Sequence, residues 1–142
     1  MTSTDYFLSL GGKMNTELYY LALTAALTGL LWLPYVLDRA LKNSMGDVAG
    51  YPLTKFNQSG WAEKLMKAHK NAVENLVVFA ALVLVAHAAG ISSPAIGTAA
   101  IVYFWARLAH AIVYLFGIPW LRTVAFLAGW VAQAVIAWQI LV

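Results

Sequence analysis

The sequence has no cysteine and very few charged residues. The lack of cysteine excludes a disulfide bond, a thiolate metal site and a cysteine nucleophile. Charged residues make up 11% of the 142 residues, whereas soluble domains carry about 25%. A chain this short would still need a polar surface to fold in water. We therefore exclude a soluble globular domain and expect the apolar surface to face lipid.

Hydrophobic residues make up 62% of the chain, and the mean hydropathy is +0.72. The apolar runs predict four helices, at about residues 16–37, 63–89, 95–116 and 120–141. Because about 20 apolar residues span a bilayer, we predict an all-α integral membrane four-helix bundle that forms one domain over residues 14–142. Residues 1–13 are predicted to be a poorly ordered extension.

The basic residues are concentrated in one stretch of the sequence. Six of the nine lie between Arg39 and Lys70, in and beside a predicted polar loop over residues 38–62. This pattern is typical of a cytoplasmic loop, so the pI of about 9.3 does not indicate a nucleic-acid partner. We predict a multi-pass protein, in the inner membrane if the source is bacterial. Both termini would face the periplasm or lumen.

Polar residues form stripes on the predicted helices, although polar groups are costly inside a membrane. The second helix has one face with the spacing i, i+3, i+4 and i+7, made of Lys67, Lys70, Asn71 and Glu74. The third helix has a similar face, made of Arg107, His110 and Tyr114, and the fourth begins close to Arg122 and Thr123. The predicted topology brings all three groups to the cytoplasmic end of the bundle.

Two interpretations of this cluster remain open. In a structural interpretation, Glu74 pairs with Arg107 or Lys70 and braces the bundle. In a functional interpretation, the three cations Lys70, Arg107 and Arg122 exceed the single carboxylate of Glu74, so the cluster binds an anion. That anion would be a small ligand that bears carboxylates or the head group of an anionic lipid. A transporter that uses Glu74 and His110 as a proton relay is less favoured, because no internal repeat supports it.

Other polar and aromatic residues suggest packing roles. His69 and His87 are isolated histidines without a second ligand at i+4, so we predict no metal site. The six tryptophans mostly lie near predicted helix ends, as anchors at a membrane surface do.

Two segments carry a family resemblance. Ala-His-Lys-Asn-Ala-Val-Glu-Asn at 68–75 is similar to the second-helix signature of the MAPEG family, the membrane-associated proteins in eicosanoid and glutathione metabolism. Arg-Leu-Ala-His-Ala-Ile-Val-Tyr at 107–114, followed by Gly-Ile-Pro at 117–119 and Arg122-Thr123, resembles the family's third helix and the loop after it. The resemblance covers nearly the whole chain from Met14.

The resemblance implies a homotrimer that binds glutathione, as a thiol co-substrate, between neighbouring protomers near the cytoplasmic side. The ligand-binding residues would be Lys70, Asn71, Glu74, Arg107, His110 and Tyr114. Arg122, with Thr123 beside it, would stabilise the thiolate. The implied activity is that of a transferase or peroxidase for lipophilic electrophiles or lipid hydroperoxides that enter from the bilayer. The alternative is a non-catalytic trimeric module that binds an anionic lipid or a structural partner.

Two positions depart from the family pattern. Phe126 stands where some eicosanoid-synthesising members have a tyrosine, and Lys70 stands where several have arginine. The first change removes a hydroxyl, and the second removes planar bidentate recognition of a carboxylate. Both disfavour prostaglandin synthesis without removing the thiol site.

Overall fold

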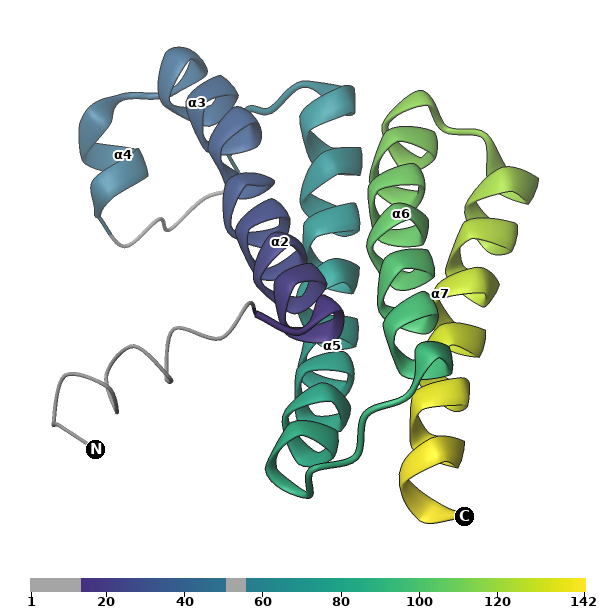
Figure 1. Ribbon diagram of the computed structural model, residues 1–142. Coiled ribbons are helices and arrows are strands. Elements are labelled where there is room, and N and C mark those ends of the chain that lie inside the picture. Colours follow the sequence, from purple (N-terminus) through teal and green to yellow (C-terminus); the bar gives the residue numbers. More distant parts are fainter. Residues whose placement is uncertain (1–13, 51–55) are drawn as a thin grey trace, which may run out of the picture.

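The computed structural model describes residues 14–50 and 56–142, and these residues form helices joined by short connections (Figure 1). The helices are α2 (Thr16–Leu30), α3 (Trp32–Lys42), α4 (Met45–Ala49), α5 (Gly60–Ala88), α6 (Pro94–Phe116) and α7 (Pro119–Leu141). The predicted extension over residues 1–13 lies outside the described residues.

Four helical segments are long and apolar enough to cross a membrane. They are Thr16–Lys42, which joins α2 and α3, and then Gly60–Ala88, Pro94–Phe116 and Pro119–Leu141. At most 39% of the apolar stretch in any of them is buried within the protomer. The remaining apolar surface needs lipid or another protein chain to cover it. Over the described residues, the prediction of an all-helical fold with four segments long and apolar enough to cross a membrane is confirmed.

The first span contains a break at Leu31. Pro34 has no backbone N–H, so the carbonyl group of Leu30 loses its helical donor four residues later. Accordingly α2 ends at Leu30 and α3 begins at Trp32, while Leu31 keeps right-handed helical angles (φ −62°, ψ −23°). The chain therefore continues through the break as one span.

The bounds predicted for the polar loop, about residues 38–62, were wrong at both ends, and residues 51–55 lie outside the described residues. Residues 38–42 belong to α3, α4 lies within the predicted loop, and α5 begins at Gly60. The charged residues after Leu37 suggested the end of a helix. In the structure, Tyr35 and Asp38 instead recur at helical spacing on the face of α3 that is buried, and α3 packs against α5. Because Tyr35 and Asp38 are three residues apart, a helix that continues past Leu37 places both on the face that packs against α5.

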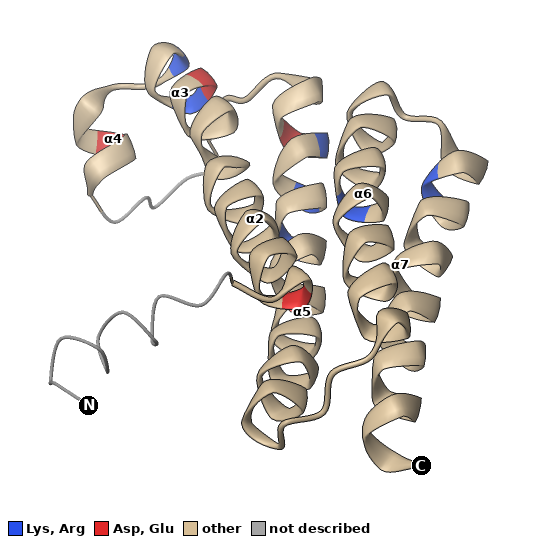
Figure 2. Ribbon diagram, viewed as in Figure 1, with Lys and Arg blue, Asp and Glu red and all other residues tan. Residues whose placement is uncertain are grey.

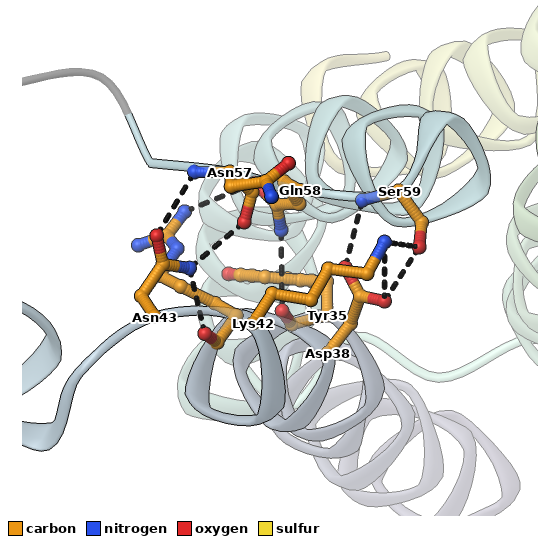
Figure 3. A network of polar contacts seen from close by, with 8 residues as sticks. Tyr35, Asp38, Lys42, Asn43, Asn57, Gln58 and Ser59 are labelled. Atoms are coloured by element: carbon orange, nitrogen blue, oxygen red, sulfur yellow. Dashed lines mark hydrogen bonds and ion pairs between the residues drawn. The ribbon is translucent and has the colours of Figure 1, made fainter.

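A polar network fastens the segment before α5 to α3 (Figure 3). The carboxylate of Asp38 accepts hydrogen bonds from the backbone N–H of Ser59 at 2.8 Å and from its hydroxyl at 2.6 Å. Lys42 forms an ion pair with the same carboxylate at 3.6 Å. The side chain of Asn43 donates to the carbonyl oxygen of Asn57 at 2.8 Å. These contacts fix the start of α5, on which part of the polar cluster lies.

Helix α6 is central in the bundle, because it packs against α2, α5 and α7. The rings of Phe79 and Tyr103 are stacked with their centroids 3.9 Å apart, and both side chains are fully buried. Helix α6 ends at Phe116. The next residue, Gly117, has a φ of +75°, the left-handed conformation that glycine adopts without strain. Pro119 then begins α7. This tight turn brings the end of α6 beside the first turn of α7.

Candidate functional site

Two adjoining hollows lie at the end of the bundle where α6 turns into α7. The inner hollow, of about 240 Å³, is lined by Lys67, Asn71, His110, Tyr114, Arg122, Thr123 and Phe126. The outer hollow, of about 290 Å³, is lined by Lys64, Lys67, Tyr114, Gly117, Ile118, Pro119 and Arg122. They share Lys67, Tyr114 and Arg122, so we treat them as one recess. Figure 2 shows lysine and arginine on α5, α6 and α7 toward this end.

Arg107 lies behind the wall of the recess and lines neither hollow. Its side chain is only 3% exposed. Its Nη1 donates to Oδ1 of Asn71 at 3.1 Å, and its Nη2 donates to the carbonyl oxygen of Phe126 at 3.3 Å. Its Nε has no hydrogen-bond partner among the described residues. The structure thus places Arg107, a predicted ligand-binding residue, where it supports Asn71 and α7.

The contact with Arg107 determines how the amide of Asn71 is oriented. A guanidinium group only donates hydrogen bonds, so the amide oxygen must face Arg107 and the NH₂ group must point elsewhere. Asn71 also lines the inner hollow. Its NH₂ group is therefore a donor for an acceptor such as a carboxylate in the recess.

The first two turns of α7 carry Arg122 and Thr123, which line the inner hollow. The guanidinium carbon of Arg122 lies 4.9 Å from the centre of the Tyr114 ring, a cation–π contact. Arg122 is exposed and forms no ion pair within residues 14–50 and 56–142. Its charge adds to the positive end of the α7 dipole. The hydroxyl of Thr123 donates to the carbonyl oxygen of Pro119 at 3.3 Å.

His110 forms part of the inner hollow from α6. It is 4% exposed, and its ring centre lies 5.6 Å from that of Tyr114 and 6.4 Å from that of Phe126. The ring of Phe126, where a tyrosine would have added a hydroxyl, lies 5.5 Å from the guanidinium carbon of Arg107. The structure thus brings six of the eight predicted site residues together, either in the recess or directly behind it.

Lys70 and Glu74 are the two predicted site residues that lie outside the recess. Both are exposed on α5, and neither lines the inner or the outer hollow. Glu74 lies near the midpoint of this 29-residue helix. Within the described part of the chain, the ion pair of Lys42 and Asp38 is the only one, so Glu74 pairs with neither Arg107 nor Lys70. The pairing of Glu74 with Arg107 or Lys70, which the structural interpretation required, is therefore not found within this chain.

The model of the MAPEG family matches residues 18–142, nearly the whole chain. The chain belongs to the MAPEG family. No curated protein matches it. Membership in MAPEG fits a membrane protein of glutathione or eicosanoid metabolism, and it confirms the resemblance that the two segments suggested.

The MAPEG motifs did not indicate every residue at the recess. Lys67 lines both hollows, and it lay on the predicted stripe without being assigned to the ligand. Lys64 precedes it by three residues on the same face of α5, a spacing that could have identified it. Gly129 of α7 leaves no room for a Cβ atom beside Arg107, and no pattern in a single sequence reveals such a close approach.

Proposed function

We propose that this MAPEG protein is a membrane-bound glutathione-dependent transferase or peroxidase. The observation that carries the proposal is the recess itself, where Lys67, Arg122 and the amide of Asn71 converge without an acidic residue among those that line it. Glutathione has two carboxylates and one ammonium group at neutral pH. Its carboxylates would supply the negative charge that the recess lacks, and it would bring the sulfur that a chain without cysteine cannot provide.

Arg122 is proposed to stabilise the thiolate of bound glutathione. A cation beside a thiol lowers the pKa of that thiol, and the N-terminus of a helix acts in the same direction. The thiolate is the nucleophile. Its sulfur attacks an electrophilic carbon and displaces a leaving group such as chloride, which gives a thioether conjugate. Alternatively, the sulfur attacks the terminal oxygen of a hydroperoxide, the O–O bond breaks, and the substrate leaves as an alcohol. The sulfenic acid formed on glutathione then reacts with a second glutathione to give the disulfide and water. The lipophilic second substrate would arrive from the bilayer.

The orientation follows the distribution of basic residues and is part of the proposal. The recess and the segment between α3 and α5 would face the cytoplasm, because positive charge beside the spans favours that side. Both ends of the chain would then face the periplasm or lumen.

We further propose that the protein is a homotrimer in which glutathione binds between protomers. The support comes from Lys70 and Glu74, two charged residues that are exposed well inside a membrane-spanning helix. A charge inside the hydrocarbon region is costly, up to roughly 2.5–3.5 kcal/mol at the centre of the bilayer on the most lenient scale. A neighbouring protomer and a bound ligand would remove both charges from lipid. Glu74 would then pair with the ammonium group of glutathione, and Lys70 with a carboxylate.

The purified protein should have a mass near three times the 15.5 kDa of the chain when native mass spectrometry removes its detergent. We expect a trimer because a single chain leaves much of its apolar surface and the charged face of α5 exposed. A protein that stays monomeric in several mild detergents and in nanodiscs would contradict the trimer.

Calorimetric titration tests the proposed ligand. Glutathione should bind with measurable heat and raise the unfolding temperature at millimolar concentration, because a ligand at 100 times its Kd stabilises a protein by about 2.7 kcal/mol. A diester of glutathione, whose carboxylates are masked, should bind at least about tenfold more weakly if one charged hydrogen bond is lost. Absence of heat and of stabilisation by glutathione, combined with stabilisation by anionic lipid, would favour the lipid-binding alternative instead.

A further inference from the structure

We propose that Gly129 of α7 is a positioning residue of the glutathione site. It leaves the space in which the guanidinium group of Arg107 lies, and Arg107 in turn orients the amide of Asn71 toward the recess. The inference rests on the proposed function, because it takes Asn71 to contact the ligand.

Glycine is needed at this position because a larger residue would bring a Cβ atom too close to Arg107. A Cβ atom at Gly129 would lie 2.7 Å from Nη2, 3.0 Å from Nε and 3.2 Å from Cζ of Arg107. Gly129 is buried within α7 and does not have a positive φ. Its backbone would therefore accept alanine, which favours a helix more than glycine does. The close guanidinium group is what alanine would meet.

Arg107 has little freedom to move away from such a Cβ atom. Its two terminal nitrogens are engaged, one by Asn71 and the other by the carbonyl group of Phe126. The guanidinium carbon also lies 5.6 Å from the ring centre of Tyr103 and 5.5 Å from that of Phe126. A shift that relieves the clash must lengthen at least one of the two hydrogen bonds. Since the side chain is buried, water does not readily replace the bond that is lost.

A weaker hydrogen bond between Arg107 and Asn71 would affect ligand binding, because Asn71 lines the inner hollow. With Arg107 in place, the amide oxygen of Asn71 is engaged and its NH₂ group is available in the recess. If the guanidinium group is displaced, the amide is free to turn and present its oxygen to the recess, where it would repel a carboxylate. Gly129 thus acts on binding through two intervening side chains and contacts no substrate.

Gly29 provides a matched control. It also lies within a membrane-spanning helix, but a Cβ atom there would have no heavy atom within 4 Å. Gly29→Ala therefore makes the same chemical change without the clash.

The test is a double-mutant cycle on the full-length protein in detergent. Gly129→Ala should raise the Kd for glutathione by about tenfold, the effect of weakening one charged hydrogen bond, while Gly29→Ala leaves it unchanged. In an Arg107→Ala background, Gly129→Ala should have no further effect on Kd. The unfolding temperature should show the same coupling: a decrease in the wild-type background and none in Arg107→Ala. Arg107→Leu, which ends before the guanidinium atoms, replaces Arg107→Ala if that variant does not fold.

The two readouts separate this inference from the proposed function. If the wild-type protein binds no glutathione, the proposed function fails, and the positioning role of Gly129 in the ligand site fails with it. Coupling in the unfolding temperature would then establish a packing contact alone. If glutathione binds but Gly129→Ala is neutral, or is equally harmful with and without Arg107, the proposed function survives and the positioning role is overturned.

Discussion

Arg122→Ala is expected to lower kcat/KM for the conjugation of glutathione to a chloronitroarene by about 100-fold. The reason is that removal of one preorganised donor beside a developing or existing anion typically costs about 100-fold to 1,000-fold. Arg122 lies at the first turn of α7 with no ion-pair partner in the described part of the chain, so its charge is available to a thiolate in the recess. The measurement is steady-state conjugation at neutral pH.

The pH profile distinguishes this role from a general loss of structure. Without the cation, the pKa of the bound thiol rises, so the rise of activity with pH should shift to higher pH and part of the loss should be recovered in alkaline buffer. Arg122→Lys retains the charge and should keep most of the activity and the original profile. An unchanged profile in Arg122→Ala would remove Arg122 from the thiolate role.

Glu74→Gln is expected to raise the Kd for glutathione by about 10-fold to 100-fold. The proposed partner of the carboxylate is the ammonium group of the tripeptide, and a hydrogen bond to a charged group contributes about 1.5–3 kcal/mol. Glutamine has nearly the same shape but no charge, so the variant changes the electrostatic interaction alone. Calorimetric titration of both proteins measures the difference.

A glutathione analogue that lacks the amino group provides the control for Glu74. It should bind more weakly than glutathione to the wild-type protein, and it should bind the wild-type protein and Glu74→Gln with similar affinity. If Glu74→Gln weakens both ligands equally, Glu74 acts on the assembly and not on the ammonium group. If it weakens neither, Glu74 lies outside the glutathione site.

The sequence predicted the spans well because their signal is local. A run of apolar residues about as long as a bilayer is thick requires a helix, since every backbone group in lipid must be hydrogen-bonded. The segment from Asp38 to Lys42 was misassigned for a related reason. Its charged residues indicate a loop when they are considered alone. However, Asp38 and Lys42 form an ion pair, and both form hydrogen bonds with Ser59, which lies 21 positions after Asp38.

The polar cluster was also predictable as a set of stripes, but the function of each member depends on packing. Arg107 and Asn71 are both on predicted polar faces, yet nothing in the spacing shows that one is buried behind the other. Gly129 was not predictable, because a glycine in a helix gives no indication of the side chain that fills its space. Only the structure shows that Glu74 is exposed and that it has no ion-pair partner among the described residues.

The proposed function requires this MAPEG protein to hold glutathione as a thiolate beside Arg122. The most direct test is the ultraviolet difference absorbance of bound glutathione at neutral pH, where a thiolate absorbs and a thiol does not. We expect a thiolate band in the wild-type protein, the same band in Arg122→Lys, and its loss in Arg122→Ala at saturating glutathione. Bound glutathione that remains a thiol in the wild-type protein, or a thiolate band that persists in Arg122→Ala, would contradict this proposal.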